Sequence, residues 1–323
     1  MTLALLFPGQ GSQSVGMGVS LADAFASARE VYAEVDEALG QKLSVLMREG
    51  PEDQLTLTEN AQPALMAVSL AAVRVLKVEF GVDVTRAAFV AGHSLGEYSA
   101  LCAAGYFSLS TTAGLLQLRG QAMQRAVPVG MGAMASLIGP RTDLALAEAA
   151  AAAGSEVGVC VVANDNNAGN IVISGDKAAV DRAIEKAKEL GARAIPLNVS
   201  APFHSPLMEP AAAEMDAVLA EVSVEPLRVP LVANVTARPV TGDWTELKWE
   251  IRRLLVEQVT GRVRWRESME WMAGEGGVTR FAEIGSGKVL GGMARRIAPD
   301  AECLSLNTPE DLEAFAKSVA SGE

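Results

Sequence analysis

The sequence AAFVAGHSLGEYSALCAA, residues 87–104, contains the segment on which the fold and the chemistry both depend. Ala87–Ala91 is typical of a short buried strand, and Gly96–Ala104 is typical of a helix that follows it directly. Between them, Gly92–Gly96 reads GHSLG and fits the pattern Gly-x-Ser-x-Gly. A sharp turn from strand to helix crowds the positions that flank the serine, so it needs glycines there and projects the hydroxyl outward. The segment predicts Ser94 as a nucleophile; the alternative is a packing turn with an idle serine.

Strand-like and helical segments alternate on both sides of this turn, which indicates an α/β fold with a largely parallel sheet. Further strands are expected at three places, which are Leu3–Phe7, Val229–Asn234 and Thr279–Ile284. Helices are expected at Ala61–Phe80, Ser110–Val127, Met208–Val222 and Glu246–Val259. Pro63 would lie near the first turn of its helix, where the missing N–H costs little.

The middle of the chain has a different order of elements. Strands are expected at Met131–Ile138, Val157–Val162, Asn170–Ser174 and Arg193–Val199, and helices at Asp143–Ala153 and Lys177–Leu190. This order is βαββαβ, the arrangement of ferredoxin-like domains. We therefore expect a ferredoxin-like subdomain at residues 130–198, inserted into a larger catalytic domain formed by residues 1–129 and 199–323.

Composition narrows the classes of function. The 323 residues carry a formal net charge of -12, which disfavours general nucleic-acid binding because a polyanion is repelled. Cys102, Cys160 and Cys303 are scattered, which argues against a disulfide framework or a zinc site and favours a reducing compartment. The apolar stretch Leu3–Phe7 is too short for a signal sequence, and no apolar run is long enough for a membrane helix. A cytoplasmic monomer without a metal is expected.

A serine nucleophile needs a base, and the chain has two histidines. His93 adjoins the serine, but successive residues in a sharp turn diverge, so its ring is poorly placed to reach the hydroxyl. His204 lies between Pro202 and Pro206 in a stiff loop, and a rigid mount suits a base. His204 is therefore the candidate base; the alternative is an ordinary loop histidine.

Arg119 lies on the apolar face of its expected helix. At 100° per residue from Leu115, it falls at about 40°, within the arc that also holds Leu118 and Ala122. A guanidinium that faces the core stays charged and must find an anion or a cavity. Arg119 could clamp a substrate carboxylate through two hydrogen bonds, or form a structural salt bridge with an internal acid. Position on the helix leaves both possibilities open.

The loop Phe7–Gln13, FPGQGSQ, follows the first strand immediately. Its two glycines and its proline can turn backbone N–H groups outward together, as an anion site or half of an oxyanion hole requires. The loop matches neither common nucleotide-binding pattern, so nucleotide binding is disfavoured. A plain connecting loop is the alternative.

Together with Gly92–Tyr98 and Arg119, several segments resemble the malonyl-CoA:acyl carrier protein transacylase family, which includes the acyltransferase domains of fatty acid and polyketide synthases. They are Phe7–Gln13, Asn60–Leu65 (NAQPAL), Pro202–Met208 (PFHSPLM) and Ile284–Leu290 (IGSGKVL). The resemblance runs almost from end to end and keeps its order. It implies an α/β-hydrolase-like large domain interrupted by a ferredoxin-like one, and an enzyme that needs no cofactor.

The resemblance also implies roles for individual residues. Ser94 would be the nucleophile, His204 the base, and Arg119 the clamp for the malonate carboxylate, with Gln62 also at the substrate. The backbone N–H groups of Gln10 and Leu95 would form the oxyanion hole. The main-chain carbonyl of Gln258 would orient the histidine in place of a triad acid. The bulk of Phe203 would favour malonyl over α-methylated groups, although ordinary packing would also explain it.

The implied substrates are a coenzyme A thioester and acyl carrier protein. Because carrier proteins of this system are acidic, a local basic surface is expected, with Arg295 and Arg296 as first candidates and Arg262, Arg264 and Arg266 next. A charge pair on a helix can equally be a solvated face. Two further alternatives stay open at this point, namely a serine esterase or thioesterase and a stand-alone acyltransferase that serves a polyketide synthase.

Overall fold

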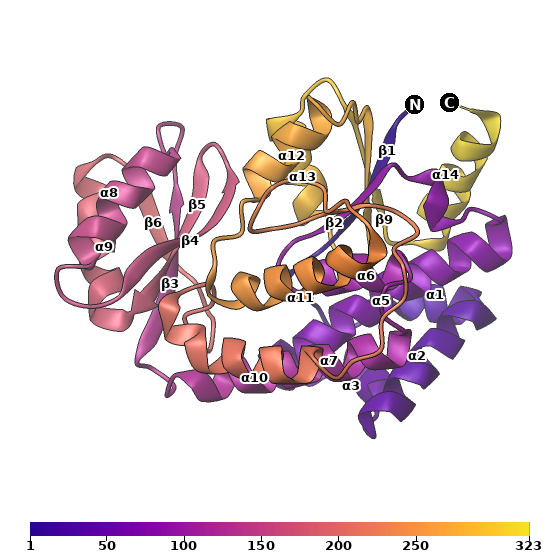
Figure 1. Ribbon diagram of the computed structural model, residues 1–323, viewed down its shortest axis with the longest axis horizontal. Helices are drawn as coiled ribbons and strands as arrows, with labels where there is room; N and C mark the ends of the chain where they lie inside the picture. The colour runs from indigo at the N-terminus through magenta and orange to yellow at the C-terminus, as the bar shows by residue number, and fades with distance from the viewer. Residues whose placement is uncertain (323) are drawn as a thin grey trace.

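The computed structural model describes residues 1–322 and contains two separate β-sheets, each with its own helices (Figure 1). The larger sheet has five parallel strands in the order β7-β2-β1-β8-β9. Their bounds are Leu231–Val232, Phe89–Gly92, Leu3–Phe7, Arg280–Ile284 and Glu302–Leu306. The smaller sheet is antiparallel. The expected mixed α/β fold is confirmed.

Strand β1 shows why a strand of the larger sheet has a continuous apolar sequence. All five of its residues are buried. Leu3, Leu5 and Phe7 join the core on one face of the sheet, whereas Ala4 and Leu6 join the core on the other. Side chains alternate between the two faces of a strand, so a strand covered on both sides must be apolar throughout. This central strand ends at the loop that reaches the candidate site.

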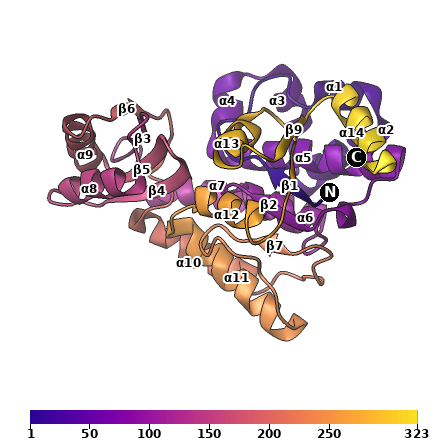
Figure 2. The same ribbon diagram turned by 90° about the horizontal axis from the view of Figure 1, so that it is seen from above.

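Helices cover both faces of the parallel sheet. The helices of the main core, on one side, include α2 (Ala26–Leu39), α5 (Thr58–Phe80), α6 (Gly96–Ala103), α7 (Leu109–Ala126) and α14 (Pro309–Ser321). On the other side lie α12 (Trp265–Ala273) and α13 (Val289–Ile297). Short helices α1 (Val19–Ala24), α3 (Leu43–Glu49) and α4 (Glu52–Thr56) complete the first segment. Seen from above, α10 (Glu209–Leu219) and α11 (Trp244–Thr260) form a flank of this part (Figure 2).

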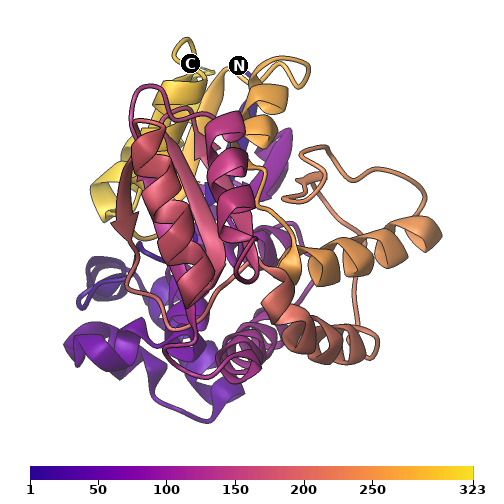
Figure 3. The ribbon, with the colours of Figure 1, turned by 90° about the vertical axis from the view of Figure 1, so that its left-hand side faces the viewer.

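The smaller sheet has the strand order β4-β5-β3-β6. Its elements follow the expected βαββαβ order as β3 (Gly132–Ile138), α8 (Leu144–Gly154), β4 (Cys160–Asn167), β5 (Asn170–Asp176), α9 (Lys177–Glu189) and β6 (Arg193–Pro196). Helices α8 and α9 cover the face turned away from the parallel sheet (Figure 3). The unit has its own apolar core, rich in alanine, between these helices and the sheet. The domain boundaries at residues 130 and 198 stay a prediction.

Several helices and strands begin or end at other residues than the sequence predicted. Helix α5 starts at Thr58, three residues before the expected start, so Pro63 lies inside the helix and not in its first turn. Strand β7 is reduced to two residues at the sheet edge, and β6 ends at Pro196. Strand β4 extends to Asn167 through four buried polar residues, because its backbone keeps pairing with β5 as far as Asn167.

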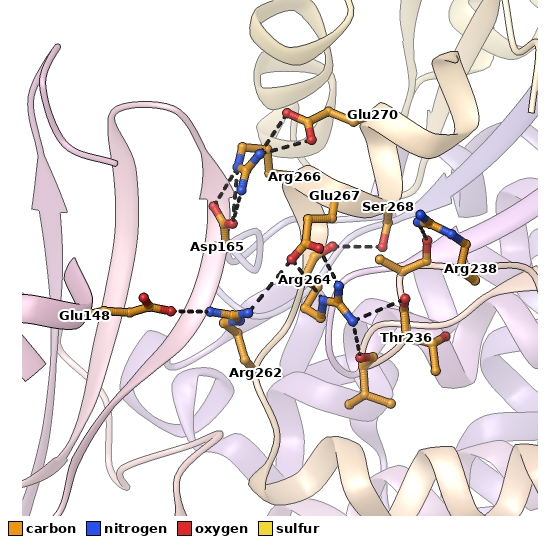
Figure 4. A network of polar contacts seen from close by, with 12 residues as sticks. Glu148, Asp165, Thr236, Arg238, Arg262, Arg264, Arg266, Glu267, Ser268 and Glu270 are labelled. Atoms are coloured by element: carbon orange, nitrogen blue, oxygen red, sulfur yellow. Dashed lines mark hydrogen bonds and ion pairs between the residues drawn. The ribbon is translucent and has the colours of Figure 1, made fainter. Parts of the chain in front are cut away.

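The segment after α11 ties the two parts together. Val263 runs beside β4: its N–H donates to Ala163 O at 2.8 Å, and its carbonyl accepts from Asp165 N–H at 2.9 Å. Arg266 then pairs with the fully buried carboxylate of Asp165 at 2.8 Å (Figure 4). Arg262 reaches Glu148 of α8 at 3.2 Å. None of the helices in residues 1–322 is both long and apolar enough to cross a membrane.

Candidate active site

A cavity of about 390 Å³ lies between the two parts of the molecule. The parallel sheet contributes the loop after β1 and the turn after β2, and the helices behind it contribute Gln62 and Arg119. The smaller sheet contributes polar side chains of β4 and β5, which are Asn164, Asn166 and Asn170. The loop that returns from β6 closes one side with Phe203 and His204. The residues predicted for catalysis and substrate binding therefore surround one space.

The turn at Ser94 is as tight as its glycines predict. A Cβ on Gly92 would lie 1.9 Å from the carbonyl of Gly96, and one on Gly96 would lie 2.2 Å from the carbonyl of Phe7. Ser94 itself has a positive φ of 53°, which is uncommon for a residue with a side chain. Asn234 holds the turn from outside, since its Oδ1 accepts from Ser94 N–H at 2.8 Å and its Nδ2 donates to Gly92 O at 2.7 Å.

His204 lies against the hydroxyl of Ser94, with 2.7 Å between Nε2 and Oγ. Its Nδ1 lies 2.9 Å from the main-chain carbonyl of Gln258, which can only accept, so Nδ1 carries the proton and Nε2 is free to take one. His204 also has a positive φ, of 56°. The strained backbone is held by its neighbours, for example by Ser205 Oγ, which donates to Pro202 O at 2.7 Å. The geometry is that of a base beside a nucleophile.

The acids considered for a conventional triad lie elsewhere. Asp165 pairs with Arg266, and Asp176 accepts from Val159 N–H at 2.7 Å. A carbonyl oxygen therefore fills the orienting position beside His204. Burial, together with the nearby charge of Arg119, lowers the pKa of His204 to about 3. The imidazole is consequently neutral at physiological pH, as a proton acceptor must be.

His93 faces away from the hydroxyl, as the sharp turn predicts. Its Nε2 lies 2.9 Å from Oδ1 of Asn166 on β4, and its ring packs against Trp265. Burial lowers the pKa of His93. This neutral ring joins the nucleophile turn to the smaller sheet, so its part in the site is to fix the position of one wall.

Arg119 is 1% exposed, and its guanidinium forms no ion pair within residues 1–322. Its Nη1 donates to Oε1 of Gln62 at 2.8 Å, and its Nη2 donates to Oε1 of Gln258 at 2.8 Å. Nη2 also lies 3.2 Å from Ser94 Oγ. A buried guanidinium held by two neutral amides keeps its charge available to an anion in the cavity. The alternative of a structural salt bridge is thus not what the structure shows.

Gln10 and Leu95 both line the cavity, and each has a backbone N–H group. Neither N–H group has a hydrogen-bond acceptor among residues 1–322. The loop that carries Gln10 is tied to α5, because Thr58 Oγ1 donates to Gln10 Oε1 at 3.2 Å. Leu95 stands at the start of α6, where the helix dipole favours negative charge. Two free N–H donors beside one cavity are what the stabilisation of an oxyanion requires.

The remaining predicted residues divide into two groups. Gln62 and Phe203 are buried and line the cavity, and Gln62 Nε2 is held by Thr58 Oγ1 at 3.0 Å. Arg295 and Arg296 are exposed on α13, where Arg295 donates to Cys303 O at 3.0 Å. The second set of basic candidates is different, because all three form ion pairs: Arg262 and Arg266 pair with acids across the junction of the two parts, and Arg264 pairs with Glu267 of α12 (Figure 4).

Two residues at the site were missed by the sequence reasoning. Asn234 braces the turn, and Glu97 lies behind it, 1% exposed, with a pKa that burial raises to about 7. A signal for Glu97 was present: it falls in the first turn of α6, three residues after the serine. No such local signal marks Asn234, which follows the short edge strand β7. No group of His, Cys, Asp or Glu within residues 1–322 is arranged to hold a metal ion.

Comparison with known proteins agrees with this geometry. Residues 4–278 match the acyl transferase domain family. The chain is 44% identical over 312 residues to a malonyl CoA-acyl carrier protein transacylase of Bacillus subtilis, which covers 96% of this chain and 95% of that relative. It is similar to the crystal structure of an acyl-carrier-protein-S-malonyltransferase from Bartonella henselae, with a TM-score of 0.94, 53% identity, and coverage of 99% and 100%.

A further solved structure shows a malonyl-transacylase in complex with its type II PKS acyl-carrier protein. The chain matches it with a TM-score of 0.93 and 38% identity, over 98% of this chain and 100% of that one. The family match spans most of the chain, and these relatives align over nearly its whole length. The chain therefore belongs to the acyl transferase domain family.

Proposed function

We propose that this acyltransferase moves a malonyl group from malonyl-CoA to the phosphopantetheine thiol of acyl carrier protein, through an ester on Ser94. The single observation that carries the proposal is the meeting of three side chains around one cavity, with Ser94 Oγ 2.7 Å from His204 Nε2 and 3.2 Å from Arg119 Nη2. A nucleophile, a base and a free cation within one pocket suit an acyl group that carries its own carboxylate. The names of the relatives support the same reaction.

The first half of the reaction uses the neutral imidazole. His204 takes the hydroxyl proton as Ser94 Oγ attacks the thioester carbonyl, and the backbone N–H groups of Gln10 and Leu95 bind the oxygen that becomes negative. Each such donor is worth roughly 3 kcal/mol in the transition state. The C–S bond then breaks, His204 returns its proton to the leaving thiol, and a malonyl-serine ester remains. Arg119 holds the malonate carboxylate throughout.

The second half reverses these steps with a different thiol. The phosphopantetheine thiol of the carrier protein gives its proton to His204 and attacks the ester carbonyl. The same two N–H groups stabilise the second tetrahedral intermediate. Collapse of that intermediate releases Ser94, which regains its proton from His204. One thioester is broken and one is formed, so the reaction needs no cofactor and no external energy source.

The hydrolase alternative has less support. In hydrolases with this turn, the histidine is normally oriented by an acidic side chain, whereas here a carbonyl of Gln258 occupies that position. A general esterase would also not need a buried guanidinium without an ion-pair partner, because most ester substrates carry no carboxylate for it to bind. One relative is solved with a type II PKS acyl-carrier protein, so the carrier protein of a polyketide system is the second candidate partner. The cytoplasmic location and the monomeric state stay predictions.

The deciding experiment is intact-mass spectrometry of the purified protein after incubation with malonyl-CoA. We expect one malonyl adduct on Ser94 that persists in water and disappears when holo acyl carrier protein is added. Ser94→Ala is the control and should show no adduct. Release of free malonate at the rate of turnover, without need for a thiol acceptor, would instead identify a hydrolase.

A further inference from the structure

The side chain of Gln258 connects Arg119 to a buried acid. Its Oε1 accepts from Arg119 Nη2 at 2.8 Å. Its Nε2 donates to Ser94 O at 3.0 Å and also to Oε2 of Glu97. The main-chain carbonyl of the same residue orients His204. One glutamine thus touches the nucleophile turn, the base and the guanidinium.

Glu97 lies behind this glutamine and does not line the cavity. It is 1% exposed, and its second oxygen, Oε1, accepts from Asn234 N–H at 3.3 Å. Both carboxylate oxygens therefore face N–H donors. Because a carboxylate only accepts hydrogen bonds, these two donors favour the ionised acid and oppose the burial that raises the pKa of Glu97 to about 7.

We propose that Glu97 is a positioning residue for the substrate clamp: it orients the Gln258 side chain so that the amide oxygen faces Arg119, and it supplies a counter-charge one amide away from the guanidinium. The inference rests on the proposed role of Arg119 in binding the malonate carboxylate. A carboxylate in direct contact with Arg119 would occupy the N–H donors that the substrate needs. With no acid nearby, burial of the guanidinium would cost more free energy. An intervening amide avoids both problems.

The test is the isosteric change Glu97→Gln. In either orientation, the new amide places an NH₂ group against a donor, either Asn234 N–H or Gln258 Nε2. In the first orientation, Gln258 keeps its acceptor but the negative charge behind it is lost. In the second, the Gln258 side chain is displaced, and Arg119 loses one of its two amide supports. We expect kcat/KM for malonyl-CoA to fall roughly ten- to a hundredfold, the range for a displaced hydrogen bond to a charged group. Transfer from acetyl-CoA, which has no carboxylate to clamp, should change by less than about threefold.

A matched control separates this role from a general loss of stability. Glu283 is also 1% exposed, and both its oxygens accept from backbone N–H groups, at 3.0 Å from Leu290 and at 2.8 Å from Gly291. Its carboxylate has no hydrogen bond to Gln258 or Arg119. Glu283→Gln should lower the midpoint of unfolding but leave the ratio of malonyl to acetyl transfer unchanged.

Gln258→Ala tests the route from Glu97 to Arg119 even if Glu97→Gln folds poorly, and a double-mutant cycle tests it when both variants fold. Gln258→Ala retains the carbonyl that orients His204 but removes the amide, so it should lower the malonyl-to-acetyl ratio by itself. Adding Glu97→Gln to Gln258→Ala should then change that ratio by less than about twofold, because the route from Glu97 to Arg119 has gone. Independent, multiplying effects in the cycle, or an equal loss for both substrates in Glu97→Gln, would overturn the inference.

The outcome for Arg119→Ala distinguishes failure of the proposed clamp from failure of the positioning role of Glu97. If that variant keeps its preference for malonyl-CoA, the clamp itself is wrong and the proposed function is in doubt. If it loses the preference while Glu97→Gln keeps it, the clamp stands and only the positioning role of Glu97 fails.

Discussion

Arg119 is the residue whose substitution most directly tests substrate choice. Its guanidinium is buried, faces the cavity and is held by the amides of Gln62 and Gln258. Arg119→Ala should reduce kcat/KM for malonyl-CoA about a hundredfold, since a bidentate charged hydrogen bond contributes roughly 3 kcal/mol. Acetyl-CoA should become the better substrate. Steady-state kinetics with both thioesters measures this directly, and a variant that still prefers malonyl-CoA would refute the clamp.

The buried imidazole of His204 should make the free energy of unfolding depend on pH. Burial lowers the pKa of His204 to about 3, below its unfolded value near 6.5. Between these two values the unfolded chain binds a proton that the folded chain does not, so the free energy of unfolding falls as the pH drops from about 6.5 toward 3. His204→Asn removes this titration and tolerates the positive φ.

Urea denaturation at pH 7 and pH 4.5 measures the difference. The wild-type protein should lose more stability between these two conditions than His204→Asn does. The raised pKa of Glu97 acts in the opposite direction over part of this range, but it is present in both proteins and cancels in the comparison. Equal losses in the two proteins would show that the buried imidazole is not the group that titrates.

At the scale of elements, the turn from β2 to α6 depends on the absence of side chains at two positions. A methyl group on Gly92 would meet the backbone of Gly96 at 1.9 Å, and backbone cannot move aside as a flexible side chain can. Gly92→Ala should therefore destabilise the protein by about 3 kcal/mol or more, or prevent folding. Thermal unfolding followed by circular dichroism measures it.

A second glycine provides the control for this element. Gly114 lies in α7 with open space around its Cα hydrogen, so Gly114→Ala should stabilise the helix by about 0.5–1 kcal/mol. The two identical substitutions should thus shift the midpoint of unfolding in opposite directions. If Gly92→Ala left the midpoint of unfolding unchanged, the turn would be less crowded than the structure shows.

At the scale of the whole molecule, the junction between the two sheets depends on a buried ion pair. Asp165 on β4 is fully buried and has Arg266 as its charged partner, 26% exposed in its side chain. Arg266→Ala leaves the carboxylate without that partner and should cost about 3–5 kcal/mol. The exposed pair Arg182–Glu185, at 3.7 Å, is the control, and Arg182→Ala should cost less than about 1 kcal/mol. Equal effects of the two variants on urea unfolding would contradict this account of the junction.

Carrier-protein recognition also belongs to this scale. The chain has a net charge of -12, so an acidic partner needs a local basic surface. Arg295 and Arg296 are exposed on α13, a helix whose first residues line the cavity. Reversing both charges with Arg295→Glu and Arg296→Glu should raise KM for carrier protein about tenfold and leave KM for malonyl-CoA unchanged. Arg182→Glu, on α9, is the control and should change neither value.

Local sequence patterns predicted an element correctly where its conformation is set by its own residues. The apolar run Leu3–Phe7 predicted β1 with its observed bounds, and Gly-x-Ser-x-Gly predicted a crowded turn. Sequence patterns gave the wrong bounds where a segment is covered by residues from a distant part of the chain. Residues Asn164–Asn167 look like a loop because they are polar, but they form the end of β4, held in part by the Val263 segment about 100 residues later.

The α/β class, the nucleophile turn and a short list of candidate residues could be predicted from the amino-acid sequence, because strand composition, glycine spacing and the scarcity of histidine can be read without the fold. The packing of distant segments was needed to show that Arg119 lies between two amides with no acid of residues 1–322 in contact, and that Asn234 braces the turn with Glu97 behind it. The physical reason is that hydrogen bonds between residues as far apart as Ser94 and Gln258 exist only when the packed sheet brings their segments together.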